Sequence, residues 1–377
     1  MTATTTATAT STVPDVKPLQ SKKKSTSSRP FTAAAPPPVD LEGKTVPFSQ
    51  RWGFSSHVFT NDLIRSSVFD AVVIGSFVAF NASPYAIKTY AYLEENFTPF
   101  QINAYGTFAI TTLLYWAFAG LFAFVDLTGR PRFLFKYKVQ PFARVDARDY
   151  AKIAQVVIKN QLVVVLPLIL AKGKIFPSAI SPSKLQGPWE TLGHIFFNVL
   201  CTEVGFYFIH KTFHSPALYA TYHKQHHTLT APVGLGATYC GVAEHLFSNL
   251  LPNAIGTTIL QPHWSVALFT FCYLEIGTIC AHSGYNFPYM HTSLRHDWHH
   301  FSFNENFGPT GLLDILFGTG KRYDQALADG MKRNGGDLDK AREDLLARLA
   351  VWEASTEKND VVEESLDEED VKKALLE

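Results

Sequence analysis

Residues 223–227 read His-Lys-Gln-His-His, residues 296–300 read His-Asp-Trp-His-His, and residues 210–214 read His-Lys-Thr-Phe-His. Helical residues three or four apart share a face, so each cluster can direct two or three imidazole rings toward one point. Neutral imidazole suits iron, zinc, copper and nickel, so the ligand type alone does not name the metal. Eight rings exceed what one ion accepts and therefore predict two metal ions. The candidate ligands are His210, His214, His223, His226, His227, His296, His299 and His300.

A ninth candidate ligand, His282, lies in the segment Ala281-His-Ser-Gly-Tyr-Asn286. A single histidine is more often a structural or surface residue than a ligand. Three clusters of related spacing make that interpretation weak here, because many buried polar rings without partners would be costly. His245 and His291 are weaker candidates. The remaining three are predicted to be ordinary: His57, His194 and His263.

Long apolar stretches surround the clusters, and 30 of the 377 residues are phenylalanine. One membrane span needs about 20 mainly apolar residues. The stretch 246–281 is longer and is broken at Gln261-Pro262-His263, which predicts a helical hairpin of two shorter spans. The other four predicted spans are 66–87, which is interrupted by Asp70 and ends near Pro84, 107–127, 156–171 and 191–209.

Charge predicts the orientation of these spans. Loop 129–152 carries seven basic residues against Asp146 and Asp149, and basic loops face the cytosol. Counting spans from there places all three histidine clusters on the cytosolic side. We therefore expect an all-α fold: a polytopic membrane helical bundle whose cytosolic helical cap carries a histidine-rich dimetal site.

Acidic residues near the clusters are predicted to hold the ligand rings. Neutral ligands leave the positive charge of the metals uncompensated. In metal sites this charge is commonly offset by carboxylates that accept a hydrogen bond from the second ring N–H of a ligand histidine. Acids inside membrane spans are rare and usually functional. Pairing with lysine is the alternative for each of them. The candidates are Glu203, Glu244, Glu275 and Asp297, with Asn286 facing the site directly or through water.

The two ends of the chain differ from its centre. Residues 1–50 are rich in Thr, Ala, Ser and Pro and predict a disordered tail. Residues 321–377 hold 10 Lys/Arg and 16 Asp/Glu, which indicates an acidic tail with one surface helix. Residues 51–149 would form the first spans and the basic loop, and residues 150–320 the catalytic domain. A net charge of zero argues against a nucleic-acid partner, and four cysteines without a C-x-x-C pair argue against a disulfide framework.

On its motifs, the chain resembles the fatty acid hydroxylase / sterol desaturase superfamily, whose pattern is H-x(3,4)-H followed by two H-x-x-H-H boxes. Segments 223–234, 282–288 and 296–300 are similar to C-4 methylsterol oxidases. Segments 244–252 and 311–319 look closer still to the related fatty acid hydroxylase domain-containing proteins. Asn286 stands near the position where fatty acid 2-hydroxylases carry a further histidine, which argues against that branch. The resemblance implies that the metal ligands are His210, His214, His223, His226, His227, His282, His296, His299 and His300.

The resemblance also implies an endoplasmic reticulum enzyme with two ferrous ions, O₂ as oxidant, and electrons from cytochrome b5 and an NAD(P)H reductase. Zinc would occupy the same ligands in some purified forms. The favoured substrate is a 4-methylsterol, with hydroxylation or desaturation of a sphingoid base or fatty acid as the alternative. Two other classes are a zinc hydrolase, which would need a motif such as H-E-x-x-H, and a non-enzymatic lipid-binding regulator. The first lacks its motif here, and the second would not need nine imidazoles.

Overall fold

The computed structural model of this chain describes residues 63–140 and 145–321, together with residues 323, 328, 332, 335 and 336. The predicted tail 1–50, His57 and nearly all of the predicted acidic segment 321–377 lie outside the described residues.

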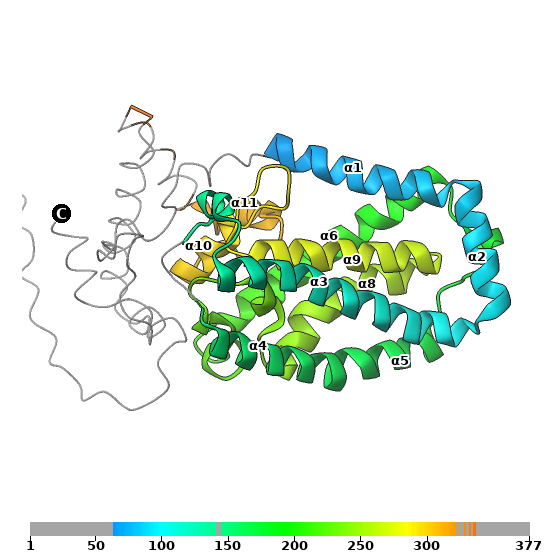
Figure 1. Ribbon diagram of the computed structural model, residues 1–377, viewed down its shortest axis with the longest axis horizontal. Coiled ribbons are helices and arrows are strands. Elements are labelled where there is room, and N and C mark those ends of the chain that lie inside the picture. The colour runs from blue at the N-terminus through cyan, green and yellow to red at the C-terminus, as the bar shows by residue number, and fades with distance from the viewer. Residues whose placement is uncertain are drawn as a thin grey trace, which may run out of the picture.

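Within the described residues, the fold is built from helices that run mostly along one long axis (Figure 1). The only β-type pairing within this part of the chain is one isolated bridge between Lys138 and Tyr285. The expected all-α class is therefore confirmed. The α-helices are α1 (Leu63–Asn81), α2 (Pro84–Asn96), α3 (Thr107–Thr128), α4 (Ala147–Asn160), α5 (Leu166–Ile175), α6 (Pro188–Phe213), α7 (Val242–Glu244), α8 (Leu251–Leu260), α9 (Trp264–His282), α10 (Leu294–Ser302) and α11 (Leu312–Phe317).

Four helical segments are long and apolar enough to cross a membrane: Gln101–Thr128, Ala147–Ile175, Pro188–Phe213 and Trp264–His282. The chain is thus a multi-pass membrane protein. A fifth span is present if α1 and α2 count as one, although they are bent by 66°. The sequence predicted a span over 66–87 that ends near Pro84; α1 ends at Asn81, and Pro84 starts α2 with Ser83 as its N-cap. Proline is favoured at the first position of a helix, which is why the chain breaks there.

The predicted hairpin is present, with its break at residues 261–263 between α8 and α9. Its first arm, a π-helical turn at His245–Leu250 followed by α8, is shorter than a full span needs. This arm packs closely on α6, because a Cβ at Gly256 would lie 2.6 Å from the Cα of Asn198. The amide oxygen of Asn198 accepts a hydrogen bond from the backbone N–H of Thr257 at 3.0 Å. The short arm is therefore fixed to α6 by both shape and a buried hydrogen bond.

A large buried apolar cluster of the described residues joins α3, α4, α9 and the segment 229–239, and it includes Tyr115, Ile153 and Ile279. It lies between the membrane helices and the loops that carry histidines. Burial of such large side chains stabilises each by roughly 1.5–3 kcal/mol. The histidine loops are therefore built on a packed apolar support.

The histidine-bearing ends of α6 and α9 meet α10 and α11 at one end of the bundle, and α2 lies at the other end (Figure 1). The loop after α3 reaches the same end. Its Val139 N–H donates to Gly284 O, and Asn286 N–H donates to Tyr137 O, both at 2.9 Å. The prediction that the histidine clusters and the basic loop share one end of the bundle thus agrees with the fold.

Candidate metal centre

The nine predicted ligand residues converge on two points inside this end of the bundle. Each point collects one nitrogen from every ring of its group, and all nitrogens of a group lie within 4.8 Å of one another. We call the two groups cage A and cage B. Cage A comprises His210, His214, His223, His227 and His299, and cage B comprises His226, His282, His296 and His300.

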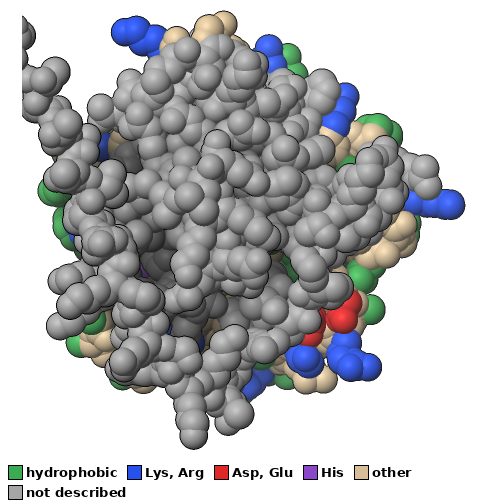
Figure 2. Space-filling view, turned by 90° about the vertical axis from the view of Figure 1, so that its left-hand side faces the viewer, with side chains coloured by type: hydrophobic (Ala, Val, Ile, Leu, Met, Phe, Trp, Pro, Cys, Tyr) green, Lys and Arg blue, Asp and Glu red, His purple; other side chains and the backbone are tan. Residues whose placement is uncertain are grey.

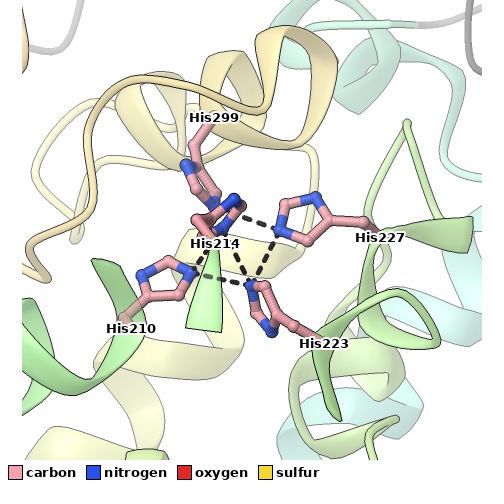
Figure 3. A group of neighbouring side chains, drawn as sticks. All are labelled: His210, His214, His223, His227 and His299. Atoms are coloured by element: carbon pink, nitrogen blue, oxygen red, sulfur yellow. Dashed lines mark hydrogen bonds between the residues drawn. The ribbon is translucent and has the colours of Figure 1, made fainter. Parts of the chain in front are cut away.

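Cage A is drawn in Figure 3, where five rings from different segments point toward one another. His210 is near the end of α6, and His214 follows its last residue. In this cage the Nε2 atom of His223 lies 3.0 Å from that of His210, 2.9 Å from that of His214 and 3.0 Å from that of His227. The Nε2 atom of His299, on α10, lies 3.2 Å from that of His227. The five ring nitrogens therefore surround one position that could hold a metal ion.

Cage B forms around His282, the last residue of α9. Its Nε2 atom lies 3.1 Å from Nε2 of His226 and 2.9 Å from Nε2 of His296. The Nε2 atom of His300 lies 3.2 Å from that of His296. The structure therefore places His282 with the three clusters, as the sequence predicted.

The two H-x-x-H-H motifs are divided between the cages in a crossed manner. In the first motif, His223 and His227 belong to cage A and His226 to cage B. In the second motif, the residues four apart belong to cage B, and His299 belongs to cage A. The sequence predicted that two or three rings of each motif would point to one place. Two rings of each motif do share a cage, but the third belongs to the other cage, so the members of each His-His pair point to different cages.

The close nitrogen contacts cannot all be hydrogen bonds. Each neutral imidazole carries one N–H, and the Nδ1 of His210 lies 2.8 Å from the carbonyl oxygen of Phe307, which fixes the proton there. Its Nε2 then presents a lone pair to both His214 and His223, 3.3 and 3.0 Å away. Those two are themselves 2.9 Å apart. Among three such nitrogens, at least two are both N–H donors or both lone-pair acceptors, and these two repel each other. A cation bound between the lone pairs removes this repulsion.

Burial keeps the rings neutral and so suited to a metal. It lowers the pKa of His223 to about 3. Burial, followed by the neighbouring imidazoles, also lowers the pKa of His214, His226 and His227 well below the ordinary histidine value. Because metals bind the unprotonated ring, these histidines are ready ligands at neutral pH.

The second nitrogens of four ligand rings are held from outside the cages. The carboxylate of Glu244 lies 2.8 Å from Nδ1 of His223, as the sequence predicted for this acid. Backbone carbonyls hold three more rings, a role that sequence reasoning missed because any residue can supply one. They are Phe307 O with His210, Glu305 O with His299 at 2.6 Å, and Thr278 O with His282 at 2.8 Å.

Asp314, on α11, holds the loop that supplies two of those carbonyls. This fully buried carboxylate accepts from the backbone N–H of Phe307 at 2.9 Å, from that of Gly308 at 2.7 Å, and from the hydroxyl of Thr319 at 2.6 Å. The likeness of segment 311–319 to the related proteins does not by itself predict this role for the acid. An aspartate in an apolar segment flanked by two glycines was the available signal.

Glu203 acts on the same loop from α6. Its carboxylate accepts from the backbone N–H of Thr310 and of Leu313, both at 3.0 Å. It therefore anchors the segment that follows Phe307 and the start of α11. The sequence predicted an acid near the metals at this position, and the bonds of Glu203 described here are to backbone rather than to an imidazole.

Asp297, another predicted acid, is buried and accepts from the side-chain amide of Gln140 at 2.7 Å. Gln140 also donates to Thr230 O at 3.0 Å, so it ties the basic loop to the segment after the first H-x-x-H-H motif. Asn286 accepts through Oδ1 from the Thr292 hydroxyl at 3.0 Å and the Ser293 N–H at 3.1 Å. Both residues thus shape the loops beside cage B.

A buried ion pair lies under the same loops. Lys138 pairs with Asp126, and their side chains are 6% and 7% exposed. Asp126 also accepts from the hydroxyls of Tyr150 at 2.7 Å and Tyr285 at 2.8 Å. Lys138 was counted among the basic residues that orient the chain, but it is an internal partner of Asp126.

The other candidates lie away from the cages or at their edge. Glu275 is in α9, and its Oε2 is buried without a hydrogen-bond partner. His245 is buried beside Glu244, its Nδ1 lies 3.3 Å from the Asn249 amide, and burial lowers its pKa to about 4. His291 lies 3.6 Å from Asp70. His263 caps α9 and His194 lies 3.8 Å from Glu190, so neither joins a cage.

Lysine and arginine side chains appear at several points around the rim of the cage end, where described residues are visible (Figure 2). Exposed basic residues of this end include Arg130, Lys136, Arg148 and Lys211. The charge pattern is consistent with the end that the positive-inside rule places in the cytosol.

Comparison with known proteins gives a consistent result. The family model described as fatty acid hydroxylase matches residues 195–319. The chain is 33% identical over 356 residues to Fatty acid hydroxylase ahd1 of Mycosarcoma maydis, an alignment that covers 90% of this chain and 91% of that protein. It is 32% identical over 229 residues to human Fatty acid hydroxylase domain-containing protein 2, which covers 59% and 68% respectively. It is 29% identical over 259 residues to Methylsterol monooxygenase 2-2 of Arabidopsis thaliana, which covers 65% and 94%. No solved structure matches the chain.

Proposed function

The chain belongs to the fatty acid hydroxylase family, and on that basis we propose that it is a membrane-bound di-iron monooxygenase that oxidises a C–H bond of a lipid. The observation that carries this proposal is the pair of histidine cages. Nine imidazoles, seven of them buried and two half-buried, meet at two points that could each hold a metal ion, and in cage A a cation would relieve the contact between like nitrogens. The nine residues are proposed as the metal ligands.

Two iron ions bound there would supply the activation of O₂ and the hydrogen abstraction, which side chains alone do not perform. The residues of the chain provide position and electrostatics. Glu244 holds the His223 ring and offsets positive charge, and the carbonyls of Phe307 and Glu305 fix the rings of His210 and His299. Access of water is limited because seven of the nine rings are buried and only those of His214 and His296 are half-buried. Zinc would fit the same nitrogen donors and is expected to replace iron in some purified samples.

The favoured substrate is a 4-methylsterol. Methylsterol monooxygenases from plant, amoeba and vertebrates align with this chain over 87–94% of their own length at 26–30% identity. A fatty acyl or sphingoid chain is the second candidate, supported by the nearly full-length similarity to Fatty acid hydroxylase ahd1. A shared metal site does not choose between them, because function within a fold depends on the shape of the lipid pocket.

We assign the catalytic unit to residues 150–320 and the preceding spans to residues 51–149. The cage end is proposed to face the cytosol of the endoplasmic reticulum, where cytochrome b5 and an NAD(P)H reductase would supply electrons. Exposed Arg130, Lys136 and Arg148 at this end favour that orientation.

The test is a lipid profile of cells that lack this protein, complemented with wild type or with His299→Ala. Accumulated 4-methylsterols that wild type clears and the variant does not would support the sterol assignment. Normal sterols with depleted hydroxylated fatty acids or sphingolipids would support the second candidate. Rescue by His299→Ala equal to that by wild type would overturn the oxygenase and favour a lipid-binding regulator. The matched control is His194→Ala, a histidine of α6 outside both cages.

A further inference from the structure

The short helix α11 turns an apolar face outward at the cage end of the bundle. Leu312, Ile315, Leu316 and Phe317 are 55%, 65%, 71% and 52% exposed. The opposite face carries Leu313 and Asp314, which are buried. Four neighbouring exposed apolar side chains on six residues form a contiguous patch, and such patches mark contact with another phase or molecule.

The patch continues a lipid-facing stripe on α6. Phe196, Leu200, Val204 and Phe208 follow one another at intervals of four residues and are 69%, 39%, 40% and 50% exposed. Residues four apart lie on one face of a helix. The stripe reaches α11 directly, because the rings of Phe208 and Phe317 are 5.7 Å apart and Phe317 also stacks on Tyr207 at 5.5 Å.

The depth of α11 follows from the length of this stripe. Trp189, 85% exposed, stands at the start of α6, and tryptophan favours the membrane–water interface. Nineteen residues separate it from Phe208, which at 1.5 Å per residue is about 28 Å, close to the ~30 Å of a hydrocarbon core. Exposed Lys211 follows within one turn, as expected for the headgroup level. Phe208 and α11 therefore lie where the acyl chains end on the cage side.

We propose that α11 is an interfacial membrane helix: its outer face, Leu312, Ile315, Leu316 and Phe317, inserts into the acyl–headgroup boundary of the bilayer leaflet on the cage side. The occupant of the patch is lipid, because the patch is continuous with the lipid-facing side of a spanning helix.

Insertion of this helix has a structural consequence at the cages. Asp314, on the inner face of α11, holds the N–H groups of Phe307 and Gly308. The Phe307 carbonyl in turn holds the ring of His210. One short helix thus contacts the bilayer on one face and orients a cage A ring through the other. The insertion itself stands on the membrane-spanning fold and does not depend on the proposed function.

The test measures depth with the full chain in nanodiscs. Leu316→Cys is labelled with bimane, Lys136→Cys provides the matched site on an exposed loop residue at the same end, and the unsubstituted chain, labelled in parallel, gives the background from the four native cysteines. Lipids brominated at carbons 6 and 7, lipids brominated at carbons 11 and 12, and iodide in the buffer serve as quenchers.

We expect the shallow bromines to quench the label at position 316 at least twofold more than the label at position 136, and more than the deep bromines do. We expect iodide to show the reverse preference between the two sites. Iodide quenching at 316 equal to that at 136 would show a water-exposed helix and overturn the proposal. Protection at 316 from bromine and iodide alike would show that protein, such as a second copy of the chain, covers the patch, and would also overturn it. None of these readouts requires metal or activity, so they fail or succeed independently of the oxygenase assignment.

Discussion

Replacing Asp314 by asparagine tests whether this carboxylate positions the cage from a distance. Asp314 accepts three hydrogen bonds, from the N–H groups of Phe307 and Gly308 and from the Thr319 hydroxyl. Bonds to a charged acceptor contribute about 1.5–3 kcal/mol each. Asparagine retains one oxygen but turns an amide N–H₂ toward a donor, so at least one bond is lost and one buried donor is left without a partner.

The expected cost of Asp314→Asn is therefore about 2–4 kcal/mol in the free energy of unfolding, or a fall of roughly 5–10 °C in Tm. Because the Phe307 carbonyl loses its support, the ring of His210 is held less firmly and the iron content per chain should fall as well. Differential scanning fluorimetry in detergent and metal analysis of the same preparation measure both quantities.

Thr319→Val is the matched control, since it removes a single donor to the same carboxylate and leaves both backbone bonds in place. We expect it to cost about 1.5–3 kcal/mol, the contribution of one such bond, and to leave the iron content unchanged. An Asp314→Asn protein with wild-type Tm and wild-type iron content would refute the reasoning, because the loop would then be held by something other than this side chain.

Three further outcomes follow from the structure. Glu244→Gln should weaken metal binding by about 10–100-fold, since the ring of His223 loses a charged partner; chelator competition measures this, and an unchanged affinity would contradict the assigned role. Lys138→Met should cost about 3–5 kcal/mol by leaving Asp126 buried without its cation, and the double variant with Asp126→Asn should recover most of the lost Tm; no recovery would show that Lys138 acts otherwise. The free energy of unfolding should fall as the pH drops below about 6.5, and metal retention should fall over the same range. The unfolded chain then binds a proton at His223, whereas in the folded chain the pKa of His223 is lowered to about 3 and the ring stays unprotonated. Melting curves from pH 7.5 to 5 check the sign, and a Tm that rises on acidification would contradict it.

The sequence predicted the membrane helices well where apolar runs were long and uninterrupted. The span 191–209 became α6, Pro188–Phe213, and the break at residues 261–263 separates α8 from α9. Over 66–87 the apolar composition runs past the end of α1 at Asn81, and the predicted end near Pro84 came from the proline rather than from hydropathy. Hydropathy reports the phase that surrounds a segment, whereas the end of a helix depends on a single residue such as a proline or a cap.

The convergence of the nine histidines could be predicted, because imidazoles at helical spacing form a recognisable pattern; that they bind metal stays a prediction. The grouping could not be predicted, because the assignment of His226 and His227 to different cages depends on the segment 219–228, where a π-helical turn is followed by a 3₁₀ turn. The backbone carbonyls that hold the rings could not be predicted from the sequence either, since every residue has a carbonyl. Glu244 was predicted with its bond to a ring; Asp314, which acts through a loop, was not.

The crossed division of the two H-x-x-H-H motifs affects how the ions enter. His226 and His227 are adjacent in the chain yet serve different ions, and the same is true of His299 and His300. An ion that binds in one cage fixes the backbone of both motifs. Less conformational entropy is then lost when the second ion binds in the other cage. Filling should therefore be cooperative, so that chains with one ion are scarce at every ratio of iron to protein. A titration would then pass from empty to doubly loaded molecules, and a preparation with an average of one ion per chain would be a mixture of those two species.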